Sequence, residues 1–243
     1  MKKEILSVIS NVPLTDGIWR IVLDGCSECR PGQFVNIALD GLYLRRPISV
    51  SGWKDGVLTL LYKVVGRGTA LMTGLEPGER VDALTGLGNG FDTAVACKAP
   101  LLIGGGIGCA PLFMLAEELL SSGKDVTIVC GYRTSGEIVD MSGLEALGAK
   151  VLLATEDGSA GVRGFVTDAI AAGAGNYDYY YACGPLPMLK AIVAGLDCEG
   201  ELSLEERMGC GFGICMGCTC KTSRGPARVC KEGPVFKKNE ILW

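Results

Sequence analysis

The segment Pro100-Leu-Leu-Ile-Gly-Gly-Gly-Ile-Gly-Cys-Ala-Pro111 sets the fold of the middle of the chain. Its first four residues are an apolar run typical of a buried strand, and the glycines after them indicate a tight turn. Residues 112–122 then form an amphipathic run that predicts a helix. Backbone N–H groups at such a strand–loop–helix junction can bind a pyrophosphate. The candidate binding residues are Gly104, Gly105, Gly106 and Gly108.

The glycine spacing differs from the usual dinucleotide fingerprint, so a tight turn without a ligand is the alternative. Downstream, short apolar runs at residues 126–130, 150–154 and 177–182 alternate with helical patterns at 144–147, 165–172 and 185–196. This alternation predicts βαβ units and a parallel sheet. Cys183-Gly184-Pro185 follows the last of these strands, where open parallel sheets bind ligands. A small buried residue before a helix start is an equally good explanation of that motif.

The first 90 residues have a different pattern. Short apolar or alternating runs occupy residues 18–23, 33–39, 48–51, 57–64 and 80–84, with hardly a helix between them. Turn signals separate them, including Pro31-Gly32, Asp40-Gly41, Asp55-Gly56 and Pro77-Gly78. This part of the chain is therefore predicted to be a small antiparallel barrel.

Two motifs of the predicted barrel could bind an anionic cofactor. In Arg45-Arg46-Pro47-Ile48-Ser49, arginine can grip phosphate and serine can hydrogen-bond the edge of a flavin ring. Gly66-Arg67-Gly68-Thr69 precedes a predicted helix at residues 70–75 and is a second potential anion site. Each motif is weak in isolation, because paired arginines usually form a solvated face.

The tail carries Cys210-Gly-Phe-Gly-Ile-Cys215-Met-Gly-Cys218 and, further on, Cys230. The C-x4-C-x2-C spacing with a distant fourth cysteine is the pattern of a plant-type 2Fe–2S loop. Spacing assigns the first three ligands, and the one-residue separation of Cys220 from Cys218 favours Cys230 over Cys220 as the fourth. The predicted ligands are Cys210, Cys215, Cys218 and Cys230, with Cys220 in place of Cys230 as the alternative. A zinc site would more usually show two compact pairs, and disulfides would need an oxidising compartment.

Bulk composition limits the possible partners. The 243 residues are 48% hydrophobic, carry a net charge of −4 and include 12 cysteines but no histidine. This charge gives no basic footprint for nucleic acid, and no apolar run approaches the ~20 residues that span a bilayer. The N-terminus lacks the pattern of a signal peptide. We therefore expect a soluble cytoplasmic redox protein that binds neither nucleic acid nor membrane.

Taken together, these motifs resemble the ferredoxin–NADP reductase superfamily. Three segments narrow the resemblance to the electron-transfer subunits of NAD-dependent (type B) dihydroorotate dehydrogenases: Arg46-Pro-Ile-Ser49, Ser203-Leu-Glu-Glu-Arg-Met-Gly-Cys210 and Val229-Cys-Lys-Glu-Gly-Pro-Val-Phe236. The resemblance covers nearly the whole chain. It implies an FAD-binding β barrel over residues 1–95, an NAD-binding α/β domain with a parallel sheet over 96–199, and a 2Fe–2S module over 200–243.

The resemblance also implies residue roles. NAD would approach the flavin along the loop from Gly104 to Pro111, with Cys183, Gly184 and Pro185 near the nicotinamide. Many superfamily members have an aromatic residue where this chain has Pro-Ile. Arg133 could favour a 2′-phosphate, and no acidic residue marks the end of that strand, so NAD over NADP follows from the resemblance alone. FAD would lie on Arg46, Pro47, Ile48, Ser49, Leu61, Tyr62, Lys63, Gly68 and Thr69.

The implied function is electron transfer in pyrimidine biosynthesis. A separate FMN-containing catalytic subunit would oxidise dihydroorotate, and electrons would pass through the cluster and FAD of this chain to NAD⁺. The resemblance implies a heterotetramer with two copies of each subunit. The sequence itself offers no convincing general base for dihydroorotate oxidation. One alternative is the flavin and iron–sulfur subunit of a sulfide dehydrogenase or a ferredoxin–NADP bifurcating oxidoreductase. Another is a non-catalytic zinc- or redox-sensing nucleotide-binding module.

Overall fold

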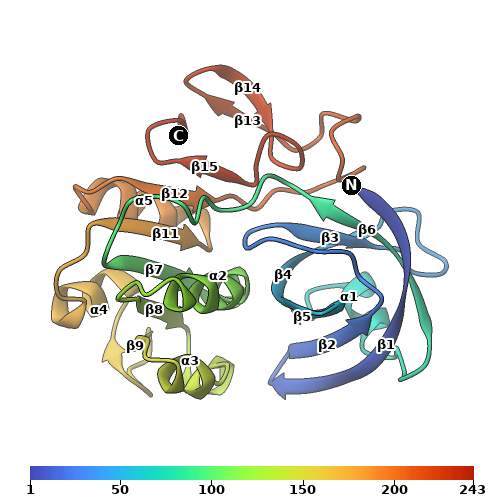
Figure 1. Ribbon diagram of the computed structural model, residues 1–243, viewed down its shortest axis with the longest axis horizontal. Coiled ribbons are helices and arrows are strands. Elements are labelled where there is room, and N and C mark those ends of the chain that lie inside the picture. The colour runs from blue at the N-terminus through green and yellow to red at the C-terminus, as the bar shows by residue number, and fades with distance from the viewer.

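The computed structural model describes residues 1–243, and its N-terminal part is a closed antiparallel barrel (Figure 1). Alternate strand residues such as Leu6, Ile21 and Leu60 fill its interior. In sequence, the short helix α1 (Arg67–Met72) lies between the fifth and sixth strands of the barrel. The barrel strands are β1 (Lys2–Thr15), β2 (Ile18–Asp24), β3 (Phe34–Ile37), β4 (Arg46–Lys54), β5 (Val57–Lys63) and β6 (Arg80–Leu87), arranged in the order β1-β2-β5-β4-β3-β6. The predicted barrel is confirmed.

The first strand, β1, was not among the apolar runs recognised in the sequence. Along its 14 residues only Leu6 and Val8 are buried, so hydrophobic alternation is too sparse to reveal a strand. It forms because it pairs with β2 on one side and β6 on the other. Pairing on both edges is a tertiary effect that a local pattern does not contain.

The second part is a seven-stranded sheet with helices on both faces (Figure 1). Leu115 of α2 and Leu144 of α3 pack on one face, and Val166 of α4 and Ile192 of α5 on the other. The predicted alternation of strands and helices is confirmed. The helices are α2 (Ala110–Ser121), α3 (Ser142–Ala146), α4 (Val166–Gly173) and α5 (Leu186–Gly195). The sheet order is β10 (Val162–Arg163), β9 (Lys150–Thr155), β8 (Thr127–Tyr132), β7 (Pro100–Gly105), β11 (Tyr179–Cys183), β12 (Gly200–Ser203) and β15 (Val235–Lys237).

This sheet extends beyond residue 199, where we placed the start of the cluster module. Strand β12 pairs parallel with β11, and β15 returns antiparallel to β12. Between them lie the cysteine loop and a hairpin of β13 (Thr219–Thr222) and β14 (Gly225–Arg228). The sequence pattern missed β12 because a four-residue strand without a following helix has no periodic signal.

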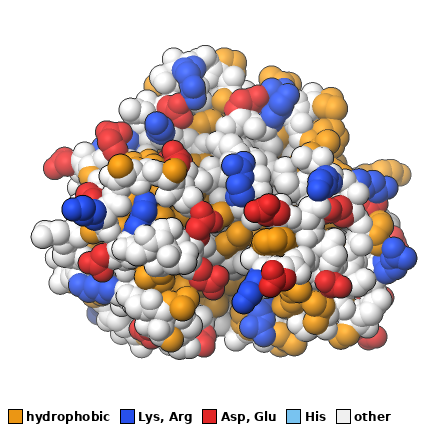
Figure 2. Space-filling view, viewed as in Figure 1, with side chains coloured by type: hydrophobic (Ala, Val, Ile, Leu, Met, Phe, Trp, Pro, Cys, Tyr) orange, Lys and Arg blue, Asp and Glu red, His pale blue; other side chains and the backbone are white.

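The barrel and the sheet domain share a small apolar interface. Ile18 and Leu61 from the barrel pack with Ala110 and Val139 from the second domain. Asn89, in the connecting segment, donates to the carbonyl of Val235 and accepts from its N–H, which ties the connection to the sheet edge. Basic and acidic side chains are interspersed over the surface in Figure 2. No helix has both the length and the apolar character needed to cross a bilayer.

A buried carboxyl on β12 makes the stability depend on pH. Glu201 is 5% exposed and accepts a hydrogen bond from the Asp92 N–H at 3.0 Å; burial raises its pKa from 4.5 to about 7. The folded state therefore holds this proton more tightly than the unfolded state. Its contribution to stability is complete below pH 4.5 and is lost as the pH rises through about 7.

We expect Glu201→Gln to keep the hydrogen bond from Asp92 and to remove the cost of ionising a buried carboxyl at high pH. At pH 8 the variant should be more stable by about 2 kcal/mol, a rise in Tm of roughly 4–8 °C. At pH 5 it should melt close to the parent protein. Thermal melts at both pH values measure the difference, and the exposed neighbour Glu199→Gln is the matched control. An equal shift at both pH values would contradict the titration argument.

Candidate functional site

Two adjoining cavities lie at the junction of the barrel and the sheet domain. Their volumes are about 380 and 590 Å³. Lys63, Ile107 and Glu205 line both of them, so the cavities form one continuous cleft. A cleft at the carboxyl ends of parallel strands is where open α/β sheets bind their ligands.

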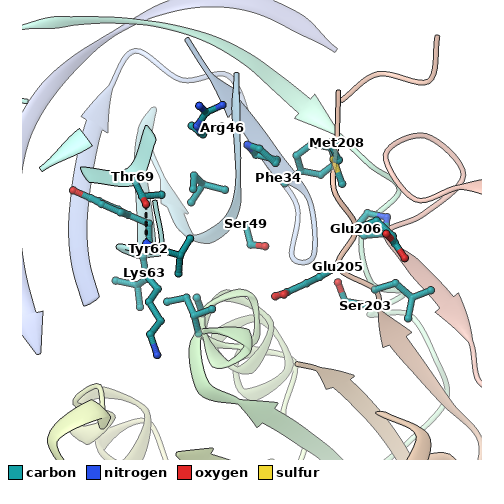
Figure 3. Close-up of a pocket in the computed structure, with 18 residues that line it drawn as sticks. Phe34, Arg46, Ser49, Tyr62, Lys63, Thr69, Ser203, Glu205, Glu206 and Met208 are labelled. Carbon is teal, nitrogen blue, oxygen red and sulfur yellow. Dashed lines mark hydrogen bonds between the residues drawn. The ribbon is translucent and has the colours of Figure 1, made fainter. Parts of the chain in front are cut away.

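The first cavity is lined mainly by the barrel (Figure 3). Its wall combines the apolar Ile48 and Leu61 with the cation of Arg46 and the hydroxyl of Ser49. This combination suits a flavin, which has an apolar ring system with polar edges and an anionic pyrophosphate. Of the residues predicted to contact FAD, those that line it are Arg46, Pro47, Ile48, Ser49, Leu61, Tyr62, Lys63 and Thr69.

Gly68 is the predicted FAD residue that does not line the cavity. A Cβ at this position would overlap the guanidinium of Arg46. The missing side chain therefore leaves room for Arg46, whose Nη1 donates to the carbonyls of Leu44 and Arg45 at 2.7 and 3.2 Å. Thr69 closes the adjacent turn, where its hydroxyl oxygen accepts from the Val65 N–H at 2.9 Å.

The second cavity is lined by the loops of the sheet domain. Four of the predicted nucleotide-binding residues line it together: Gly105, Gly106, Gly184 and Pro185. Between the two cavities, a 3₁₀ turn over Gly106–Cys109 runs into α2. Ala110, the first residue of α2, lines the first cavity, so the aligned peptide groups present the positive end of the helix dipole to the cleft, and no acidic side chain in the first turn offsets it.

Three predicted nucleotide residues pack behind the cavity and do not line it. A Cβ on Gly104 would come within 2.8 Å of the Cys109 Cα, and one on Gly108 within 2.5 Å of the Cys183 carbonyl oxygen. Cys183 itself is 2% exposed, and burial raises the pKa of its thiol. Because Gly104 and Gly108 have no side chain, the loop at Gly106–Cys109 can pack closely against the turn after β11.

One acidic residue at the second cavity was missed by the sequence reasoning. Glu137 ends a 3₁₀ turn (Ser135–Glu137) after β8 and accepts hydrogen bonds from Lys63 Nζ at 3.2 Å and Arg133 Nε at 3.0 Å. Arg133 first, and Lys63 with it, lower the pKa of this carboxyl to about 2. The expectation that no acidic residue marks this strand end is wrong, because the turn folds Glu137 back beside Arg133.

Glu205 was also missed as a site residue, although it lies within a motif that we quoted. It follows β12 and lines both cavities. Its carboxylate and the Ser49 hydroxyl are directed into the same part of the first cavity (Figure 3). Desolvation by the surrounding protein raises the pKa of Glu205. The first cavity therefore has polar groups on both its barrel side and its sheet side.

The predicted cluster ligands lie beside the first cavity, held by the barrel. Asn36 on β3 donates from Nδ2 to the Cys210 carbonyl at 3.1 Å. The neighbouring Gly211 has a φ of +78°, and a Cβ there would overlap the Asn36 amide. Met208, two residues before Cys210, lines the first cavity. The cysteine loop therefore begins at the cavity wall.

The four thiols lie as two pairs. The Cys210 N–H donates to Cys215 Sγ and the Cys230 N–H to Cys218 Sγ, both at 3.4 Å. Burial opposes ionisation of Cys210, but N–H groups of the loop outweigh it and lower its pKa to about 6. Burial and the neighbouring Cys218 thiol raise the pKa of Cys230 to about 12.

This pairing agrees with the chemistry of a two-iron centre. Each iron of a 2Fe–2S cluster takes two cysteines in addition to the bridging sulfides, whereas a structural zinc ion draws four ligands to one point. No three Cys, Asp or Glu side chains converge to hold a single metal ion. Loop N–H groups from Phe212, Ile214 and Cys215 donate to Cys210 Sγ at 3.3–3.5 Å, and hydrogen bonds of this kind tune the potential of an iron–sulfur cluster. The donor set therefore fits a 2Fe–2S cluster.

Cys220, the additional thiol, lies on β13 and pairs with Ala227 of β14. Its side chain is partly buried against the core of the sheet domain, and burial raises its pKa. It belongs to neither of the two thiol pairs.

Comparisons with known proteins agree with these three sites. A family model described as the iron–sulfur cluster binding domain of dihydroorotate dehydrogenase B matches residues 205–242. Another, described as an oxidoreductase NAD-binding domain, matches residues 102–194. The electron transfer subunit of dihydroorotate dehydrogenase B (NAD(+)) from a Geobacillus species is 42% identical over 256 residues, covering 100% of this chain and 99% of the relative. The Fusobacterium nucleatum subunit of the same name is 39% identical, with 99% of each chain covered.

Solved structures show the same architecture. The structure of an NADH-dependent reduced ferredoxin–NADP oxidoreductase has a TM-score of 0.87 and 28% identity, covering 98% of this chain and 90% of that one. The FAD/NAD binding domain of a Vibrio cholerae nitric oxide dioxygenase has a TM-score of 0.69 at 20% identity, covering 82% and 97%. The second likeness shows the fold alone.

Proposed function

Because the chain belongs to the family of electron-transfer subunits of NAD-dependent dihydroorotate dehydrogenase B, we propose that it carries electrons between a catalytic partner and NAD⁺ in pyrimidine biosynthesis. When bound, FAD and the 2Fe–2S cluster supply the electron-transfer chemistry. The observation that carries the proposal is the alignment of three sites in one chain: the cysteine loop, the first cavity and the second cavity, each adjoining the next.

The protein groups bind and orient these components. Arg46 and Ser49 would hold the pyrophosphate and the ring edge of FAD, and the four paired cysteines would hold the cluster. The glycine loop at Gly105 and Gly106, at the N-terminal end of α2, would receive the pyrophosphate of NAD. Glu205 and Ser49 are directed into the same part of the first cavity, where they would hydrogen-bond the polar edge of the flavin.

We further propose that the partner is an FMN-containing dihydroorotate-oxidising subunit, assembled as two copies of each chain. The exposed apolar side chains Ile214 and Met216 flank Cys215 in the cysteine loop. Tyr43 and Leu44 are also exposed, in the segment before β4 that leads to Arg45, whose Nη1 donates to the Asn36 carbonyl. Exposed apolar groups beside the cluster loop support a docking site for the catalytic subunit there.

The alternative assignment to a bifurcating oxidoreductase has less support. The ferredoxin–NADP oxidoreductase shares the architecture at 28% identity, whereas the dihydroorotate dehydrogenase subunits reach 42% over the whole chain. The match to the cluster-binding domain of dihydroorotate dehydrogenase B favours the same assignment.

The division of labour between the subunits can be tested on the purified chain after loading with FAD and the cluster. We expect it to oxidise NADH with an artificial dye as acceptor, because the NAD and flavin sites are in this chain. We expect no turnover of dihydroorotate, because the proposed division places that oxidation on the partner subunit. Adding the catalytic subunit should restore dihydroorotate-dependent reduction of NAD⁺. Dihydroorotate oxidation by the single chain would refute the division.

A further inference from the structure

Two cysteines outside the sites described above have their thiols in contact. Cys26 and Cys29 follow β2 in the sequence Cys-Ser-Glu-Cys, and their Sγ atoms are 3.8 Å apart. Both are free thiols, 4% and 2% exposed. The sulfurs of a disulfide are about 2 Å apart, so a further approach of about 2 Å would join them. Two cysteines separated by two residues also have the spacing of redox-active dithiols.

The segment between the two thiols is held in place by the barrel. The carbonyl oxygen of Ser27 lies 3.2 Å from Cys26 Sγ and 3.5 Å from Cys29 Sγ. Ser27 is tied to β1, because its N–H donates to Oε2 of Glu4 at 3.3 Å and its hydroxyl donates to Oε1. The same Oε2 accepts from the Thr85 hydroxyl of β6 at 2.6 Å. The folded barrel therefore keeps the two sulfurs together before any bond forms between them.

The two thiols differ in how readily they ionise. The hydrogen bond from Cys26 lowers the pKa of the Cys29 thiol, and the Gly86 N–H assists it against the opposing effect of burial. The same contact, together with burial, raises the pKa of Cys26. The thiolate is the nucleophilic form of cysteine. Cys29 is therefore suited to attack an oxidant, and Cys26 to supply the second thiol.

The cover over the pair limits the size of the oxidant. Glu28, between the two cysteines, and Arg30, directly after them, are exposed, so the thiols lie just beneath a surface segment. A bulky disulfide would have to displace this segment to reach either sulfur. Hydrogen peroxide is little larger than water, and it oxidises a thiolate to a sulfenic acid.

We infer that Cys26 and Cys29 are a redox-active dithiol that hydrogen peroxide converts to a disulfide, with Cys29 as the attacking thiol. The inference does not depend on the proposed function, because neither cysteine lines the cleft or belongs to the cysteine loop.

The reaction has two steps. First, a sulfur–oxygen bond forms at Cys29, the O–O bond of peroxide breaks, and the leaving hydroxide takes up the proton that Cys29 released. Second, the Cys26 sulfur attacks the Cys29 sulfur, the S–S bond forms, and the hydroxyl leaves as water with the proton of Cys26. Two thiols thus lose two electrons, and one peroxide is reduced to two waters.

The test exposes the FAD- and cluster-loaded chain to graded hydrogen peroxide, removes the peroxide with catalase, alkylates the free thiols in denaturant and digests with trypsin. Both cysteines fall on one peptide, residues 21–45, which contains no other cysteine. We expect this peptide to lose both alkyl groups and to be lighter than the unalkylated dithiol form by two hydrogen atoms. Dithiothreitol added before alkylation should restore both labels.

Cys198 is the internal control, because it is a single thiol that is more exposed than either member of the pair. If exposure alone governed the reaction, Cys198 would be oxidised first. We expect it to keep its alkyl group at doses that close the disulfide. A fully alkylated 21–45 peptide in samples where Cys198 is oxidised or the cluster is bleached would overturn the inference.

Two variants assign the attacking thiol. Cys26→Ser keeps a hydrogen-bond donor beside Cys29 but removes the second thiol, so Cys29 should gain oxygen and no disulfide should form. In Cys29→Ser, Cys26 should stay alkylated at the doses that oxidise the parent. The opposite pattern would overturn the assignment to Cys29. Thermal melts verify that each variant is folded, and the parent chain alone decides whether the disulfide forms.

Discussion

The Cys230→Ser variant is expected to lose most of its iron and acid-labile sulfide, while FAD stays bound. Cys230 is buried and its N–H lies 3.4 Å from Cys218 Sγ, so its replacement leaves one iron with a single thiolate partner. The FAD cavity does not include this residue. Electron transfer between the catalytic partner and NAD⁺ should fall to background, whereas NADH oxidation with a dye that accepts electrons from the flavin should persist.

Cys220→Ser is the matched control for this experiment. It makes the same chemical change only ten positions away, at a thiol that belongs to neither pair. We expect it to keep its iron, its sulfide and the visible spectrum of the parent protein. Loss of iron in Cys220→Ser together with full iron in Cys230→Ser would exchange the roles of the two residues.

The second large effect is expected at the flavin cavity, where Arg46→Ala should weaken FAD binding by about tenfold to a hundredfold. This is the range for loss of a hydrogen bond to a charged group. Gly68→Ala should act in the same direction, because its added Cβ would displace the Arg46 guanidinium. The affinity of both variants for FAD can be measured from the fluorescence of the flavin that is released on dilution.

Arg45→Ala is the control, since Arg45 is adjacent in sequence but does not line the cavity. Its guanidinium pairs with Asp82 at 2.9 Å and, with Lys3, lowers the pKa of that carboxyl. The variant should retain FAD and lose only a little stability, because the pair is partly exposed. Equal loss of FAD in Arg45→Ala and Arg46→Ala would show that charge near the barrel, and not contact by Arg46, governs binding.

Local chemistry made several features of this protein readable from its sequence. The thiolates of a two-iron cluster must lie within a small volume. Cys210, Cys215 and Cys218 are therefore closely spaced in the sequence and can be recognised there as a short pattern. The strand and glycine loop from Pro100 to Pro111 are likewise contiguous. The barrel strands with alternating apolar residues were recognised because their burial repeats every second residue.

Other features depend on residues that are distant in the chain. Strand β1 forms because β2 and β6 pair with it, and β12 extends the sheet because β11 and β15 flank it. Gly104, Gly108 and Cys183 were expected to touch the nucleotide, but the packing of one loop against another places them behind the cavity wall. Gly104 and Gly108 are the same residue type as the glycines that line the cavity, so only their position in the fold distinguishes them.

The sequence by itself determined the two domain types, the cysteine loop and the family resemblance, because each follows from contiguous residues and their spacing. Only the tertiary structure decided that the cavities share Lys63 and Glu205, that the four thiols form two pairs, and that Glu137 binds both Lys63 and Arg133. Lys63 and Glu137 are 74 residues apart. A hydrogen-bonded ion pair needs its two atoms within a few ångströms, so this contact exists only after the barrel and the sheet domain have packed together.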